Sequence, residues 1–231
     1  MGEPFDRALD RAVREARTEG VVVLGVDVAL LAGLATLDHT QGWEILGLPW
    51  WAWLVLATPP VLLVVALLVF PLAEVSPGRV RDATVGLLGL LVLTDAVAIA
   101  VLLTALAGAD GDDLSAGDLL AHGAVIWLSN IIAFGLLFWL LDAGGPRSRV
   151  VRGRDDPDFQ FPQDASARAG WSPRLSDYVY VALTNAIAVS PTDTMPLTRR
   201  SKGLMAVESL TAYAVVVLVI ARAVNVLGAS S

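Results

Sequence analysis

The chain has 231 residues, of which 55% are hydrophobic and 17% are charged, and its mean hydropathy is +0.65. Soluble domains carry about 25% charged residues, so this composition argues against an ordinary soluble protein, and the clustering of the apolar residues indicates membrane spans. The net charge of −7 gives no support to a nucleic-acid partner. The absence of cysteine excludes disulfides, thiol catalysis and cysteine-ligated metals, and two histidines are too few for a histidine-rich metal centre.

The first twenty residues carry charges throughout and lack the apolar core of a signal peptide. Apolar residues recur there at helical spacing, with arginines on the opposite side. This pattern predicts an amphipathic helix at the membrane surface, with a solvated tail as the alternative. The apolar positions are Phe5, Leu9, Val13 and Ala16, and the arginines are Arg7, Arg11, Arg14 and Arg17.

Five apolar segments are long enough to cross a bilayer, which takes roughly 20 residues. They are Val21–Leu37, Trp50–Ala73, Thr84–Gly108, His122–Leu141 and Gly203–Leu227. Tryptophans near the ends of the second and fourth segments match the aromatic belt that forms at headgroup level. Pro59 and Pro60, midway along the second segment, predict a kink.

Three carboxylates lie inside these apolar segments: Asp27, Asp95 and Glu208. A charged acid near the bilayer centre costs about 2.5 to 3.5 kcal/mol on insertion scales, so each is expected to be protonated, paired or facing a wet cavity. Asp95 lies deepest and is the best candidate for an ion or proton role. The alternative for Asp95 is a structural hydrogen bond to Ser129, Asn130 or a backbone carbonyl.

The stretch 142–176 is polar, rich in Pro, Asp and Arg, and without periodicity. It predicts an irregular loop or short surface helices, and its RGRDD run predicts a solvated surface. No catalytic triad, HExxH motif or phosphate-binding glycine loop is present, so we expect neither an enzyme nor a bound cofactor or metal.

The segment before the last span is short. Its apolar part, 178–189, is too short to span a bilayer and suits a re-entrant or interfacial helix. Irregular backbone at membrane depth is tolerated only against protein or a water-filled cavity, so this segment suggests a lined pore; an amphipathic helix flat on the membrane is the alternative. Two polar residues inside the helix, Thr184 and Asn185, are either loop anchors or lumen groups. The break and the polar strip that follows it are Ser190, Pro191, Thr192, Asp193 and Thr194, and the basic cluster after them is Arg199, Arg200 and Lys202.

Together these features resemble the pore module of the tetrameric potassium-channel-like superfamily, in which an outer span, a pore helix, a filter loop and an inner span follow one another. The D-x-x-P-x-T tail of that family's loop is matched at Asp193, Pro196 and Thr198, and its valine at Val189. The resemblance covers about residues 122–228, and the last span is similar to the ends of bacterial two-span modules. It implies a homotetramer around a central pathway for a small inorganic ion.

The filter itself departs from the family. Ser190 and Thr192 replace both glycines, and Pro191 replaces the tyrosine. A potassium filter aims successive carbonyls at the ion, and proline, serine and threonine resist the positive φ that this backbone uses. Potassium selectivity is therefore not expected, and a constriction would use hydroxyls, the Asn185 amide or Asp193. The basic cluster forms either an anion-favouring vestibule or an anchor at lipid headgroups.

Charge distribution predicts an orientation that conflicts with this resemblance. All but one of the 16 basic residues fall on the side that holds the N-terminus and the loop. The positive-inside rule places this side in the cytoplasm, whereas the loop of potassium channels enters from outside. Glutamate-receptor-like relatives have inverted loops of this kind.

We therefore expect an all-α integral membrane protein of a prokaryotic plasma membrane, with five transmembrane helices and a re-entrant half-helix. Its expected regions are an amphipathic segment (1–20), a three-helix region (21–121) and a pore-type module (122–231). The expected function is passive conduction of a small ion, with lipid, the ion and further copies of the chain as partners. The alternatives are a non-conducting structural or regulatory protein that keeps the pore fold, and a proton-coupled transporter that uses Asp27 and Asp95.

Overall fold

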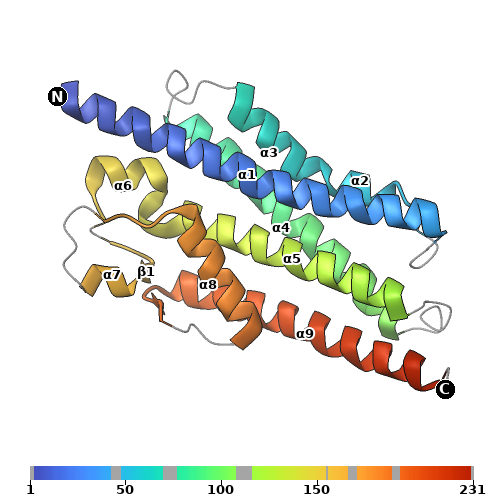
Figure 1. Cartoon of the computed structure of the whole chain (residues 1–231). Coiled ribbons are helices and arrows are strands. Elements are labelled where there is room, and N and C mark those ends of the chain that lie inside the picture. The colour runs from blue at the N-terminus through green and yellow to red at the C-terminus, as the bar shows by residue number, and fades with distance from the viewer. Residues whose placement is uncertain are drawn as a thin grey trace.

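The computed structural model is almost entirely helical and describes residues 3–42, 48–69, 77–107, 116–154, 156–165, 171–188 and 193–229 (Figure 1). The long helices are α1 (Glu3–Gln41), α4 (Pro77–Ala107), α5 (Ala116–Leu141) and α9 (Arg199–Ala229). The shorter elements are α2 (Ala52–Leu56), α3 (Thr58–Val69), the 3-10 turn η2 (Asp142–Gly144), α6 (Pro146–Arg152), β1 (Phe159–Gln160), α7 (Pro162–Ala165), α8 (Leu175–Ala188) and β2 (Met195–Pro196).

Three helical stretches of the described chain are long and apolar enough to cross a membrane. They are Leu9–Gln41, Gly117–Gly144 and Arg199–Asn225. Two further apolar helical stretches, Thr58–Val69 and Gly89–Thr104, are shorter. The helical composition of the fold is as predicted, and these stretches agree with a membrane location.

Helix α1 is continuous over its 39 residues. The predicted amphipathic segment is therefore the first half of the same helix that carries the first apolar segment. At about 1.5 Å per residue the helix measures about 58 Å, and a bilayer core is about 30 Å thick, so its charged half extends beyond the apolar layer. Its buried face recurs at helical spacing, at Leu24, Asp27, Leu31, Leu34 and Asp38.

The second apolar segment is divided at Ala57 into α2 and α3. Pro59 and Pro60 lie in the first turn of α3. Backbone N–H groups in a first turn have no intrahelical acceptor, so proline loses little there. The kink predicted at these prolines is thus a break between two helices.

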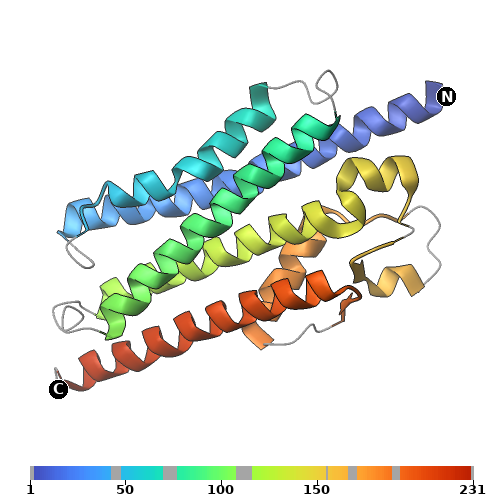
Figure 2. The same cartoon turned by 180° about the vertical axis from the view of Figure 1, so that it is seen from behind.

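Helix α5 occupies the centre of the bundle. It packs against α1, α4, α8 and α9, and α1 and α9 lie at opposite edges with α5 between them (Figures 1 and 2). Its core side chains include Ile126, Ala133, Phe134, Leu136 and Phe138, all nearly or fully buried. This central position follows from a helix that is apolar on every side.

Helix α8 is short and does not run the length of the bundle. It begins at the end of the bundle that holds the N-terminus, and the chain returns to that end before α9 begins (Figures 1 and 2). There β2 pairs with β1 in an antiparallel register of Phe159 with Pro196 and Gln160 with Met195. The C-terminus lies at the other end of the bundle.

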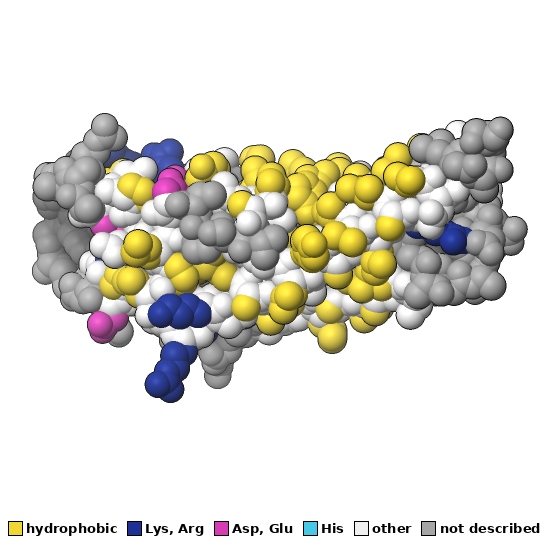
Figure 3. All heavy atoms as spheres, turned by 90° about the horizontal axis from the view of Figure 1, so that it is seen from below, with side chains coloured by type: hydrophobic (Ala, Val, Ile, Leu, Met, Phe, Trp, Pro, Cys, Tyr) yellow, Lys and Arg dark blue, Asp and Glu magenta, His cyan; other side chains and the backbone are white. Residues whose placement is uncertain are grey.

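Apolar and charged side chains occupy different parts of the surface along the bundle axis. Figure 3 shows a face on which hydrophobic side chains gather along the middle while charged side chains lie toward the ends. The exposed apolar side chains of α9 are Val207, Leu210, Tyr213, Val217, Leu218, Ile220 and Val224. An exposed apolar belt of this extent is unusual for a soluble monomer and normal for a lipid-facing surface.

Candidate functional site

The loop after α8 joins the two elements that the sequence assigned to a pore. Ser190, Pro191 and Thr192 lie outside the described residues. Of the polar strip that follows, Asp193 is exposed and Thr194 is buried. Thr198 at the start of α9 donates a hydrogen bond to Asp158 at 2.6 Å, so the returning chain is tied to the segment beside β1.

Asn185 anchors α8 to α9. Its amide donates to the Met205 carbonyl at 2.9 Å and to Glu208 Oε2 at 2.7 Å, while Ser209 donates to the Asn185 carbonyl at 3.3 Å. Asn185 is 2% exposed and Glu208 is fully buried. These bonds join α8 to α9 within one chain. Thr184 donates within its own helix, to the Val181 carbonyl at 3.0 Å.

Two further acids of the apolar segments, Asp27 and Asp95, face neighbouring positions on α5. Ser129 donates to Asp27 Oδ1 at 2.6 Å, and Asn130 donates to Asp95 Oδ2 at 2.8 Å. The predicted hydrogen bond between Asp95 and Asn130 is therefore present. Both acids are more than nine-tenths buried. Each acid is thus met by a neutral donor, an arrangement that can hold a proton within the bundle.

A second buried polar cluster lies nearer the other end of the bundle, and sequence reasoning missed it. His122 on α5 is fully buried, with Nδ1 2.7 Å from the Asp118 carbonyl and Nε2 3.0 Å from Asp38 Oδ1. Trp53 donates to the other oxygen of Asp38 at 2.6 Å. A carbonyl only accepts, so a hydrogen bond at this contact places a proton on Nδ1. Asp38 and His122 are 84 positions apart, and no local pattern links them.

The stretch after α5 is held by a buried carboxylate, Asp142. Its Oδ1 accepts the backbone N–H groups of Asp158 and Phe159 at 2.7 and 3.1 Å. Its Oδ2 accepts the Tyr178 hydroxyl at 2.5 Å and lies 3.2 Å from Arg154 Nη2. Arg154 also donates to Asp164 at 2.6 Å, and its side chain is only 13% exposed. The prediction of a solvated RGRDD surface is therefore wrong for Arg154.

Burial also changes the acid–base character of this region. Desolvation raises the pKa of the Tyr178 phenol above its ordinary value. Desolvation likewise lowers the pKa of the Arg149 guanidinium. Tyr178 therefore stays a hydrogen-bond donor to Asp142.

The predicted basic cluster divides into two kinds of residue. Arg200 donates to Asp158 Oδ2 at 2.5 Å and to the Leu141 carbonyl at 3.1 Å. Arg199 and Lys202 are exposed, as is Arg200, and Arg200 differs in its bond to Asp158. The Arg200 charge is thus offset by Asp158 and fixes the start of α9 against the end of α5.

Within the described ranges, no three His, Asp or Glu side chains converge to hold a metal ion. No family model matches this chain, and no curated protein or solved structure matches it significantly.

Proposed function

We propose that this protein is a five-span integral membrane protein that passively conducts a small ion across a prokaryotic plasma membrane. The observation that carries the proposal is the path of the chain through α8. Helix α8 packs against α5 and α9, begins at one end of the bundle, and is followed by chain that returns to the same end before α9 begins. In this proposal α8 is a re-entrant half-helix, and four copies of the chain assemble around the ion pathway. The long helices α1, α5 and α9 provide three spans, Ala52–Val69 a fourth and α4 the fifth.

The length of α8 supports a re-entrant role. Its 14 residues measure about 21 Å, which is less than the roughly 30 Å of a bilayer core. Its polar group Asn185 is satisfied inside the protein, as backbone and side chains at membrane depth must be. Its exposed side chains Tyr180 and Ile187 suit lipid or another subunit.

The expected ion preference follows from residues around the return. With Ser190 and Thr192 in place of glycines, a carbonyl ladder for potassium is not expected. Asp193 is an exposed carboxylate at the return, while Arg199 and Lys202 are exposed cations nearby in the chain. These opposing charges are the ones whose substitution should shift selectivity.

The test is a reversal potential, recorded in planar bilayers with purified protein under asymmetric salt, first exchanging the cation and then the anion. A reversal that follows one ion supports conduction. Asp193→Asn should shift the reversal toward anions, and Asp10→Asn, an exposed carboxylate on α1 at the opposite edge of the bundle, should leave it unchanged. Repeated silence from a well-folded oligomer contradicts the proposal and favours a non-conducting structural or regulatory protein.

A second candidate, proton-coupled transport, is favoured by the acids along α5. Asp27 and Asp95 contact Ser129 and Asn130 of α5. Asp38 contacts His122, which lies on α5 nearer the other end of the bundle. Protonatable groups at successive levels are what a proton relay requires. Asp95→Asn keeps the shape and removes the titration; unchanged pH-driven flux in proteoliposomes then excludes a relay through Asp95.

A further inference from the structure

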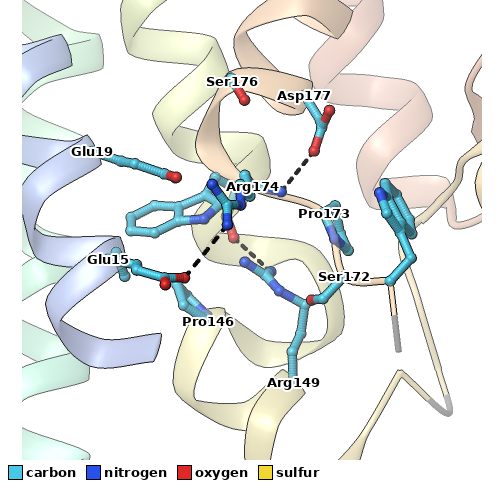
Figure 4. A pocket seen from close by; sticks show the side chains of 12 residues that line it. Glu15, Glu19, Pro146, Arg149, Ser172, Pro173, Arg174, Ser176 and Asp177 are labelled. Carbon is cyan, nitrogen blue, oxygen red and sulfur yellow. Dashed lines mark hydrogen bonds and ion pairs between the residues drawn. The ribbon is translucent and has the colours of Figure 1, made fainter. Parts of the chain in front are cut away.

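A cavity of about 470 Å³ opens at the charged end of the bundle, between α1, the turn from α5 to α6, and the start of α8 (Figure 4). Trp139 and Trp171 contribute apolar walls. Its charged lining consists of Glu15, Glu19, Arg149, Arg174 and Asp177. Tryptophan beside arginine is typical of the headgroup level of a membrane.

Arg149 is the buried cation of this cavity. The residue is 6% exposed, and its Nη1 donates to the carbonyls of Trp139 and Asp142, both at 2.9 Å. Its guanidinium carbon lies 5.4 Å from the centre of the Tyr178 ring. Within the described chain, Arg149 makes no hydrogen bond to a carboxylate. A guanidinium offers five N–H donors, so donors remain for an anion in the cavity.

The carboxylates of the cavity are largely engaged by the start of α8. Glu19 accepts the Leu175 N–H at 2.9 Å. Asp177 accepts the Arg174 N–H at 2.7 Å (Figure 4). The positive end of the helix offsets these two charges. The remaining contact, between Arg174 and Glu15, is 3.8 Å long with both side chains at least half exposed. Such an exposed pair is weak, so Arg174 can turn to a ligand.

We propose that this cavity binds a phosphate group, with Arg149 as the fixed cation and Arg174 as the adjustable one. The phosphate belongs either to a lipid headgroup or to a soluble phosphate, because both carry the same group. Arginine suits phosphate because its donors match two phosphate oxygens at once, and anionic lipid headgroups lie at the level of a membrane surface. The site does not depend on ion conduction.

The experiment uses the full chain, delipidated in detergent, with phosphatidylglycerol as the probe and diacylglycerol with the same acyl chains as the phosphate-free comparison. Binding is measured by native mass spectrometry. Arg174→Gln tests the site, and Arg11→Gln, an exposed arginine of α1 outside the cavity lining, is the matched control. We expect saturable binding of phosphatidylglycerol alone, weakened about tenfold by Arg174→Gln and unchanged by Arg11→Gln.

A second arm distinguishes the two sources of phosphate. If inorganic phosphate competes with the lipid, and Arg174→Gln weakens both, the site takes a soluble phosphate as well. If phosphate does not compete, the ligand is the lipid. Equal binding of diacylglycerol, equal effects of the two substitutions, or no saturable binding of either probe would overturn the proposal.

Discussion

Gly135 of α5 faces the backbone of Val179 in α8 so closely that a Cβ at Gly135 would lie 2.9 Å from the Val179 Cα. Real Cβ atoms essentially never approach another atom so closely, and here the neighbour is backbone, which cannot turn aside. A residue without a side chain is therefore required where the two helices meet. The close packing of α8 against α5 therefore depends on a glycine at position 135.

The first prediction is that Gly135→Ala destabilises the protein by about 1 to 3 kcal/mol, the usual cost of overpacking. Thermal unfolding in detergent, followed by tryptophan fluorescence, measures the change. Gly33→Ala is the matched control, because a Cβ there meets nothing within 4 Å. Equal melting temperatures for the two variants would show that α8 does not approach α5 in this way.

The second prediction concerns Asp142. Asp142→Asn keeps the size of the side chain but leaves the Arg154 cation facing an amide. Removing one partner of a buried ion pair costs about 3 to 5 kcal/mol, so a large fall in melting temperature is expected. Asp156→Asn, an exposed acid in the same segment, should have no measurable effect. A mild effect of Asp142→Asn would mean that its hydrogen bonds do not hold the segment 142–164.

The third prediction is a pH dependence set by Tyr178, whose pKa is raised by burial. A pKa that is higher in the folded than in the unfolded chain contributes stability below the unfolded pKa, about 10 for tyrosine. This contribution falls as the pH rises through the folded pKa. The stability difference between the wild type and Tyr178→Phe should therefore narrow above pH of about 10, in melting curves recorded at successive pH values. A constant difference across that range would contradict the burial of a neutral phenol.

Hydropathy predicts much of the bundle. The fourth and fifth apolar segments correspond closely to α5 and α9, because both helices are apolar over the length that a membrane requires. The first segment is only part of α1, since a helix can continue into charged residues once it has started. The break at Ala57 depends on Pro59 and Pro60, where proline chemistry predicts a disturbance but not whether it becomes a kink or a break.

The candidate sites could be predicted only in part. Asp27, Asp95 and Glu208 stand out as acids in apolar runs, and a donor near Asp95 is foreseeable on the same grounds. Asp142 does not stand out from its sequence neighbours in this way, because it lies where an apolar helix ends and a polar stretch begins. Its partners come from the polar stretch that follows it and from α8, and a local pattern contains no information about which distant groups will meet. The pairing of His122 with Asp38 escapes prediction for the same reason.

In the proposed topology, α8 enters and leaves at one membrane face. The chain has no cysteine, so every introduced cysteine is a single site for a membrane-impermeant maleimide. Exposed positions suit the test: Ser176 before and Met195 after the α8 return, and Gln41 and Asn225 at the other end of the bundle. We predict that Ser176→Cys and Met195→Cys are labelled from the same side, the cytoplasmic one, and that Gln41→Cys and Asn225→Cys are labelled from the opposite side. Labelling of Ser176→Cys and Met195→Cys from opposite sides would show that α8 crosses the membrane, which would contradict the re-entrant topology.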